Sequence, residues 1–176
     1  CQALAALQPE NAIVVDESLT SGFPYYALAA GAAPHTLLCL TGGAIGQGIP
    51  SATGAAVACP DRPVINLQAD GSALYTLQAL WTQARENLNV TTLICSNRSY
   101  QIIRMELKRA GLPQAGPAAA ALTDLGHPDL NWVKLSEGFG VPATSVFTAE
   151  ELATAFLRAV AEPGPHLIEM VYRPAP

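Results

Sequence analysis

The sequence predicts an α/β fold, a three-layer sandwich in which a mostly parallel sheet is flanked by helices. Half of the 176 residues are hydrophobic and only 13% are charged, which fits a parallel sheet covered on both faces. Short apolar runs alternate along the chain with segments of helical periodicity, the order expected of β-α-β units. A chain of this length can bury a substantial core, so residues 1–176 are expected to form a single domain.

The first half of the chain contains three apolar runs that predict strands and several segments that predict helices. The strands are expected at residues 11–15, 35–40 and 63–67, and the helices at residues 1–7, 51–58 and 73–86. Residues 23–30 are expected to form either a short helix or an irregular segment. In the last helix, apolar residues recur at three- and four-residue spacing in a set made of Leu74, Leu77, Leu80, Trp81 and Ala84.

The second half continues the same alternation. Strands are expected at residues 90–95 and 166–171 and within residues 141–146. Helices are expected at residues 98–107 and 148–160, and residues 127–132 lead into a short helix that ends at residues 138–140. Thr148 followed by Glu151 is a capping-box signal for the last helix. Residues 110–122 are rich in Gly, Pro and Ala and are expected to form a long, mobile loop.

Two polar residues follow neighbouring strands where those strands end. Asp70 comes after the strand at 63–67, and Asn97 comes after the strand at 90–95. Because a β-α-β unit makes these strands parallel neighbours, both side chains should lie at the carboxyl edge of the sheet, where α/β proteins bind ligands. The pattern has a structural alternative, since Asp-Gly is an ordinary turn signal and Asn often caps a helix.

The residues around this pair suit a magnesium ion that carries a phosphate group. Asp70 offers a carboxylate, Asn97 a side-chain carbonyl and Ser99 a backbone carbonyl, and Mg²⁺ prefers such hard oxygen ligands. Gly71 lets the backbone approach closely. Ser72 and the start of the following helix offer unpaired N–H groups to a diphosphate.

A glycine-rich stretch at residues 41–50 excludes two common nucleotide motifs. Gly43, Gly46 and Gly48 give the spacing G-x-x-G-x-G, whereas the dinucleotide fingerprint is G-x-G-x-x-G. The stretch also lacks the G-K-[ST] ending of a P-loop.

These motifs together resemble one enzyme family. Residues 69–72 and 96–100 are similar to the thiamin diphosphate motif Gly-Asp-Gly…Asn-Asn, and the stretch at 41–50 resembles the family loop Gly-Gly-Leu-Gly-Phe-Ala-Leu-Pro. From residue 11 to residue 169 the chain resembles the C-terminal diphosphate-binding domain of thiamin-dependent enzymes, closest in pattern to acetolactate synthase large subunits and benzoylformate decarboxylases. Two positions depart from the motif, since Ala69 replaces its first Gly and Ser96 its first Asn.

The resemblance implies the thiamin diphosphate-binding fold, with thiamin diphosphate and Mg²⁺ as cofactors and Asp70, Asn97 and Ser99 as metal ligands. The cofactor contacts it implies are Ser18, Thr20, Gly43, Ile45, Asp70, Gly71, Ser72, Asn97, Ser99 and Tyr100, and the substrate-pocket positions are Ile102, Ile103 and Glu106.

The family also assigns roles within this set. Residues after the first strand reach the diphosphate, and these are Ser18, Thr20 and Ser21 by position. Ile45 takes the place of the bulky residue that is wedged between the two cofactor rings. The backbone near Gly43 accepts a hydrogen bond from the aminopyrimidine, and its glycines leave room for the cofactor.

Each assignment leaves a structural alternative open. Residues 18–21 are also typical of a helix-capping cluster, and residues 41–50 of a tight turn between a strand and a helix. Ile102 and Ile103 are compatible with core positions of an amphipathic helix, and Tyr100 with a space-filling role.

The implied activity is thiamin diphosphate- and Mg²⁺-dependent decarboxylation or carboligation of a 2-oxo acid, as in acetolactate synthase. The alternatives are another thiamin-dependent C–C lyase, of benzoylformate decarboxylase or acyl-CoA lyase type, or an inactive homologue that serves as an interaction domain.

The activating Glu of the family lies on a separate pyrimidine-binding domain, usually of the other subunit. The chain is therefore expected to be a C-terminal fragment of a longer enzyme, inactive alone, within a homodimer or homotetramer. Glu17 is a candidate for a residue that faces the dimer interface or the substrate.

The composition argues against other classes of function. A net charge of −5 is unfavourable for nucleic-acid binding, and every apolar run is shorter than the roughly 20 residues of a membrane span. The start of the sequence lacks a signal-peptide pattern, and the four cysteines include no C-x-x-C pair, which together predict reduced thiols in a cytoplasmic protein. His35, His127 and His166 are expected to be structural.

Overall fold

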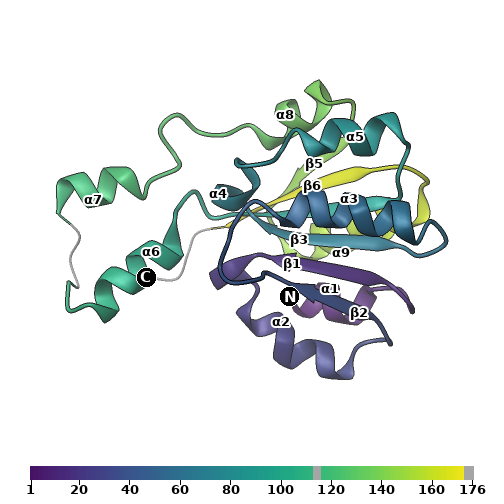
Figure 1. Cartoon of the computed structure of the whole chain (residues 1–176), viewed down its shortest axis with the longest axis horizontal. Helices are drawn as coiled ribbons and strands as arrows, with labels where there is room; N and C mark the ends of the chain where they lie inside the picture. The colour runs from purple at the N-terminus through teal and green to yellow at the C-terminus, as the bar shows by residue number, and fades with distance from the viewer. Residues whose placement is uncertain (113–115, 173–176) are drawn as a thin grey trace.

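A single parallel sheet organises the protein (Figure 1). The computed structural model describes residues 1–112 and 116–172, and within them six strands pair in the order β2-β1-β3-β4-β6-β5, with every pair parallel. The strands are β1 (Ile13–Glu17), β2 (Thr36–Cys39), β3 (Val64–Ala69), β4 (Val90–Ser96), β5 (Ala143–Val146) and β6 (His166–Val171). The predicted α/β sandwich with a parallel sheet is confirmed.

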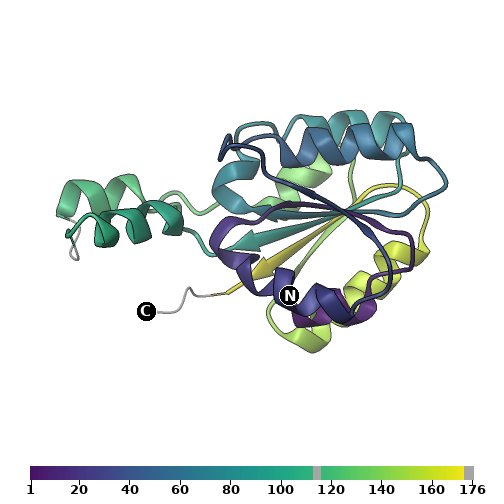
Figure 2. The same ribbon diagram turned by 60° about the horizontal axis from the view of Figure 1, so that its bottom comes forward.

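Helices cover both faces of the sheet, as Figure 2 shows from the side. One face is covered by α1 (Gln2–Leu7), α2 (Phe23–Leu28) and α9 (Ala149–Ala161), and the other by α3 (Gly48–Ala58), α5 (Ala79–Arg85) and α8 (Trp132–Gly138). Short helical segments η1 (Leu19–Ser21), η2 (Ala29–Gly31) and α4 (Asp70–Ala73) lie in the connections.

Alternating strand residues supply the cores on the two faces. Leu93 of β4 packs with Tyr25 and Phe156 on the α1/α9 side, whereas Ile94 packs with Leu80 and Trp132 on the α5/α8 side. Because successive side chains of a strand point to opposite faces, a strand buried on both sides must be apolar throughout. This explains the continuous apolar runs of the sequence.

The helix predicted at residues 73–86 is wrong as a single element. The chain forms α4, then a series of turns, and then α5. Thr76, in the turns, donates its hydroxyl to the carbonyl of Gly46 at 2.8 Å, so the break brings this segment against the glycine-rich loop. The apolar spacing correctly predicts that Leu80 is buried, but Trp81 is 50% exposed. The Arg85 guanidinium lies 5.0 Å from the centre of the Trp81 ring.

The predicted loop at residues 110–122 is also partly wrong, because residues Pro117–Leu122 form a helix, α7. Pro117 occupies the first turn, where its missing N–H is harmless, and four alanines favour the helix. Residues 113–115 of that prediction lie outside the described residues.

Among the residues that the structure describes, no helix has both the length and the apolarity that crossing a membrane requires.

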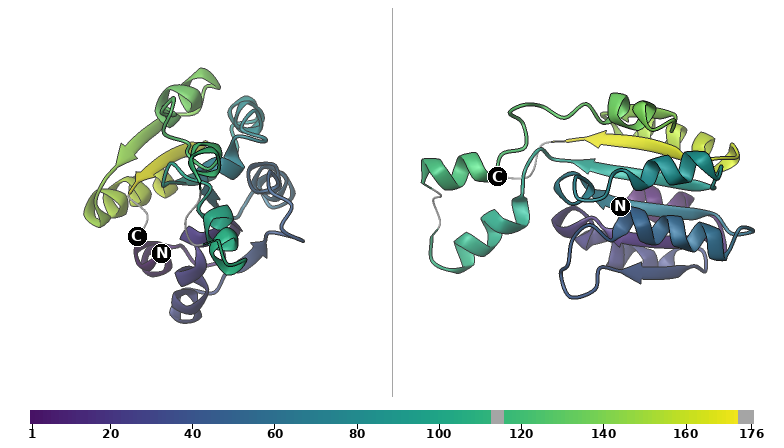
Figure 3. Two further views of the ribbon diagram at one scale, coloured as in Figure 1. Left: turned by 90° about the vertical axis from the view of Figure 1, so that its left-hand side faces the viewer. Right: turned by 45° about the horizontal axis from the view of Figure 1, so that its top comes forward.

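Helices α6 (Gln101–Arg109) and α7 project beyond the body of the domain and form an arm (Figure 3). The root of the arm is a short pairing in which Tyr100 N–H donates to Thr123 O at 3.0 Å and Leu125 N–H donates to Arg98 O at 2.9 Å. Every residue of α6 is at least partly exposed, so the arm is held at its root and not by a core of its own.

Candidate functional site

A cavity of about 370 Å³ lies beyond the carboxyl ends of β1, β3 and β4. Twelve of the predicted site residues line it: Ser18, Thr20, Gly43, Ile45, Asp70, Gly71, Ser72, Asn97, Ser99, Tyr100, Ile102 and Ile103. Leu19, Ala69, Tyr75, Gln101 and Leu122 complete the lining. The fold therefore collects segments that are far apart in the sequence around one space, at the edge where parallel sheets bind ligands.

Asp70 is the buried carboxylate of the cavity, with only 2% of its surface exposed. Its Oδ1 accepts the N–H of Gly71 at 2.8 Å, and its Oδ2 accepts the N–H of Arg98 at 2.7 Å. Burial raises the pKa of Asp70 to about 6, although the backbone hydrogen bonds act to lower it. A cation beside this carboxylate would favour its charged form.

Asn97 begins a tight turn that ends at the same cavity. Its Oδ1 accepts the N–H of Ser99 at 2.9 Å, and Arg98 between them has a left-handed φ of 56°. The helix-cap alternative for Asn97 does not hold, because the N-cap position of α6 is Tyr100.

Two hydroxyl groups at the cavity fit a polar ligand. Ser72 Oγ and Ser99 Oγ are buried and have no hydrogen-bond partner among the described residues. Buried hydroxyls without partners are unfavourable. Together with the Asp70 carboxylate and the Asn97 carbonyl, they form a set of oxygen donors of the kind that suits Mg²⁺ and a diphosphate.

Gly71 has a close neighbour that the sequence did not indicate. A Cβ at this position would lie 2.4 Å from Cε1 of Tyr100 and 3.2 Å from Cδ1 of Leu125. The glycine is therefore required for Tyr100 to pack across the start of α4.

Ser18, in the first turn after β1, lines the cavity and is held by the neighbouring carboxylate of Asp16. The amide of Ser18 donates to Asp16 Oδ1 at 2.9 Å and its hydroxyl donates to the same atom, while Tyr26 donates to Asp16 Oδ2 at 2.6 Å. In this part of the described chain, η1 and α2 lack side-chain caps, so the capping alternative fails. Ser21 lies outside the cavity lining and accepts a hydrogen bond from Tyr172.

The glycine-rich loop contains three glycines with left-handed φ: Gly42 (63°), Gly43 (70°) and Gly46 (98°). A Cβ at Gly42 or Gly43 would meet only open space, so within the protein the need for glycine there comes from the backbone conformation. Gly43 and Ile45 face the cavity.

Glu17 anchors this loop, which corrects its expected place on the dimer or substrate side. The Glu17 side chain is 1% exposed, and its oxygens accept hydrogen bonds from the amides of Gly46, Gln47 and Gly48. The sequence offered one signal for this role, a carboxylate at the end of a buried strand.

The predicted substrate-pocket residues divide into two groups. Ile102 and Ile103 line the cavity, and they are not core residues of α6, because that helix is exposed or half-buried throughout. Glu106 lies outside the lining and pairs with Arg109 at 2.6 Å on the surface.

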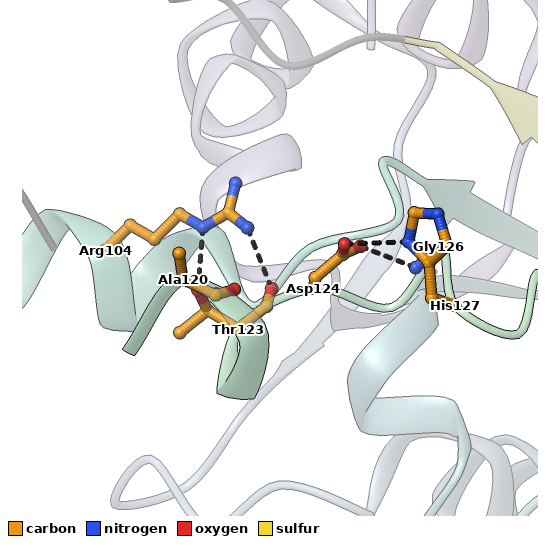
Figure 4. A network of polar contacts seen from close by, with 6 residues as sticks. All are labelled: Arg104, Ala120, Thr123, Asp124, Gly126 and His127. Atoms are coloured by element: carbon orange, nitrogen blue, oxygen red, sulfur yellow. Dashed lines mark hydrogen bonds and ion pairs between the residues drawn. The ribbon is translucent and has the colours of Figure 1, made fainter. Parts of the chain in front are cut away.

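A second polar cluster lies at the root of the arm, outside the cavity lining (Figure 4). Arg104 donates to the hydroxyl of Thr123 at 2.9 Å and to its carbonyl at 3.2 Å. Asp124 Oδ1 accepts the amide of Gly126 at 2.7 Å, and Asp124 Oδ2 lies 3.0 Å from Nδ1 of His127. The Gly126 amide and then His127 hold the pKa of Asp124 below its usual value. The exposed ring of His127 thus has a structural contact, as expected.

The described part of the chain contains no group of three or more His, Cys, Asp or Glu residues that could hold a metal. A magnesium site built on one carboxylate and phosphate oxygens does not require such a group. The four cysteines are free thiols, and burial raises the pKa of Cys95 to about 12. This thiol is therefore a buried apolar group and not a nucleophile.

The sequence profile described as "Thiamine pyrophosphate enzyme, C-terminal TPP binding domain" matches residues 23–170. The chain therefore belongs to the thiamine pyrophosphate enzyme family, as its C-terminal TPP-binding domain. It is 57% identical over 169 residues to the "Putative acetolactate synthase large subunit IlvX" of Mycobacterium tuberculosis, covering 96% of this chain and 33% of that protein. It is 33% identical over 165 residues to the benzoylformate decarboxylase of Pseudomonas aeruginosa, covering 94% of this chain and 30% of that protein.

A solved structure gives the same result. The thiamine diphosphate-dependent 4-hydroxybenzoylformate decarboxylase of Rhodococcus jostii RHA1 superposes on this chain with a TM-score of 0.84 and 33% sequence identity. The match covers 98% of this chain and 31% of the decarboxylase chain. The chain thus spans about a third of the length of the relatives it matches.

Proposed function

We propose that the cavity binds thiamin diphosphate with Mg²⁺, and that the chain serves as the cofactor-anchoring domain of an enzyme that decarboxylates or carboligates 2-oxo acids, as acetolactate synthase does. The observation that carries the proposal is the link between Asp70 and the turn at Asn97–Ser99, since Arg98 N–H donates to Asp70 Oδ2 at 2.7 Å. Two motifs separated in the sequence are thereby joined at one edge of one cavity.

The residues that line the cavity divide by the part of the cofactor that they would contact. Asp70, Asn97 and Ser99 would hold the metal, with Ser72, Thr20 and Ser18 close to the diphosphate. Gly43 and Ile45 would face the ring system. When bound, thiamin diphosphate supplies a nucleophilic carbon that adds to the substrate carbonyl. The chain's part is to bind and orient the cofactor and to form one wall of the substrate pocket with Ile102 and Ile103.

A second candidate substrate class is an aromatic 2-oxo acid such as benzoylformate. It is favoured by the match to relatives named as benzoylformate and 4-hydroxybenzoylformate decarboxylases and by the apolar side chains of Ile102 and Ile103 at the cavity. Product analysis with pyruvate and with benzoylformate separates the two candidates.

We also propose that a pyrimidine-binding domain of the same enzyme completes the site within a homodimer or homotetramer. The chain spans about a third of its relatives' length. Among the described residues that line the cavity, the one acidic side chain is Asp70, which the proposal assigns to the metal, so the Glu that activates the cofactor ring would come from the other domain. On its own the chain is expected to be catalytically inactive.

Calorimetric titration of thiamin diphosphate, with and without Mg²⁺, tests the proposal on the wild-type protein and on Asp70→Ala. We expect Mg²⁺-dependent binding that the substitution abolishes. Binding that is unaffected by both would exclude the assigned metal site. Failure of the wild-type protein to bind, with every natural domain present, would instead favour an inactive homologue.

A further inference from the structure

Glu17 is a buried carboxylate that the cofactor motifs do not include. It is the last residue of β1, is 1% exposed and lies in register with Gln68 on β3. Among the described residues no cation pairs with it. A buried charge of this kind is strongly unfavourable unless hydrogen bonds replace its lost hydration.

Four hydrogen bonds provide that replacement. Oε1 accepts the amides of Gly46 at 2.6 Å and Gln47 at 3.1 Å, and Oε2 accepts the amide of Gly48 at 2.9 Å and the side-chain amide of Gln68 at 2.7 Å. Three consecutive backbone amides thus point at one side chain, at the position where the loop enters α3.

The same part of the loop is held from its other side. The carbonyl of Gly46 accepts the Thr76 hydroxyl at 2.8 Å, and a Cβ at Gly46 would lie 2.9 Å from Cβ of Tyr75. A Cβ at Gly48 would lie 2.0 Å from Gln68 Oε1 and 2.8 Å from Glu17 Oε2. Contacts within the protein therefore require glycine at both positions, independently of any ligand in the cavity.

The preceding part of the loop lies at the cavity. Gly42 and Gly43 have left-handed φ with open space around them, and Gly43 and Ile45 line the cavity. The loop is therefore anchored at residues 46–48 and presents Gly43 and Ile45 to the cavity.

We propose that Glu17 is a positioning residue, whose carboxylate holds residues 46–48 and so places Gly43 and Ile45 for the ring system of the cofactor, separately from the diphosphate contacts near Asp70. The inference rests on the proposed function, because it assigns one part of the same site. It predicts that the two sets of contacts can be weakened independently.

The test is Glu17→Gln in the protein at its natural length. Glutamine has the same shape but only one acceptor oxygen, and each carboxylate oxygen of Glu17 accepts two donors, so two of the four donors lose their acceptor. With Mg²⁺ present, affinity is measured for thiamin diphosphate and for inorganic diphosphate, which has no rings. We expect the affinity for thiamin diphosphate to fall at least tenfold and that for inorganic diphosphate to change less than twofold. Glu150→Gln, an exposed change on α9, controls for the lost charge.

Two further measurements separate positioning from a general loss of structure. Amide hydrogen exchange should accelerate at residues 46–48 and not in β3 or β4. The double variant Glu17→Gln with Gln68→Glu supplies a carboxylate from the neighbouring strand and should restore part of the thiamin diphosphate affinity. If Glu17→Gln does not fold, Glu17→Asp keeps the charge and withdraws it by one methylene, and the same selective loss is expected.

The outcomes are distinguishable. Equal losses for both ligands, or no loss for either, would overturn the role of Glu17 while leaving the cofactor site in place. Failure of the wild-type protein to bind either ligand would overturn the proposed function, and the inference with it.

Discussion

The carboxylate of Asp70 and the backbone amide of Arg98 are 2.7 Å apart. This contact joins the end of β3 to the end of β4, so the two halves of the proposed metal site form one hydrogen-bonded unit. Arg98 adopts a left-handed φ of 56°, and its guanidinium pairs with Asp129 at 2.9 Å on the surface. The backbone conformation of Arg98 thus sets how the Asp70 carboxylate is held.

Arg98→Val is expected to lower the free energy of unfolding by about 1–2 kcal/mol, because β-branched residues rarely adopt a left-handed conformation. Arg98→Gly removes the same exposed ion pair, worth about 0–1 kcal/mol, but adopts this φ without strain, and should change stability by less than about 1 kcal/mol. Urea unfolding of the two variants measures the difference. Equal destabilisation would show that the ion pair, and not the backbone, is what matters here.

The raised pKa of Asp70 predicts how stability depends on pH. Burial lifts it from 3.8 to about 6, so the folded protein without ligands binds this proton more tightly than the unfolded chain. The contribution is fully present below pH 3.8 and is lost as the pH rises through about 6. At about 1.4 kcal/mol per pKa unit, it amounts to about 3 kcal/mol.

Asp70→Asn, which does not titrate, is the reference for this measurement. The free energy of unfolding of the wild type minus that of the variant should increase as the pH is lowered from 7 to 4. Thiamin diphosphate with Mg²⁺ should reduce the slope, because a cation favours the charged carboxylate. A difference that does not vary with pH would show that Asp70 titrates normally.

Gly71→Ala is expected to destabilise the protein by about 1–3 kcal/mol, the range for overpacking. The new Cβ would lie 2.4 Å from Cε1 of the Tyr100 ring, which cannot yield without moving the start of α6. Combining it with Tyr100→Ala should remove most of the additional cost, and a double-mutant cycle by thermal unfolding measures this coupling. Additive effects would place the strain elsewhere.

Arg104→Ala is expected to loosen the arm without unfolding the domain. Arg104 binds Thr123 through two hydrogen bonds, and α6 has no buried residue to compensate. Amide exchange in α6 and α7 should increase severalfold, while the unfolding midpoint should stay within about 2 °C. Arg109→Ala, which breaks only the exposed pair with Glu106, is the matched control. Similar exchange in both variants would contradict an anchoring role for Arg104.

The sequence by itself determined the fold class and the two motifs of the site. Apolar runs report burial on both faces of the sheet, and strand-helix-strand order makes β3 and β4 parallel neighbours, so Asp70 and Asn97 had to lie at one edge. The helix start at Thr148 was also a local signal, and the Thr148 hydroxyl accepts the Glu151 amide at 3.1 Å as expected, whereas the Glu151 carboxylate accepts the amide of Phe147 at 2.7 Å in place of that of Thr148.

Only the tertiary structure decided the rest. The pattern of Leu74 to Ala84 did not reveal the break before α5, because that break faces the glycine-rich loop through Thr76 and Gly46. The role of Glu17 depends on the same loop, which lies about thirty residues further along the chain. Periodicity and local residue preferences describe what a segment does with its own backbone and its buried face. The partner of a buried charge is set by which loops the folded sheet brings together, and no local pattern encodes it.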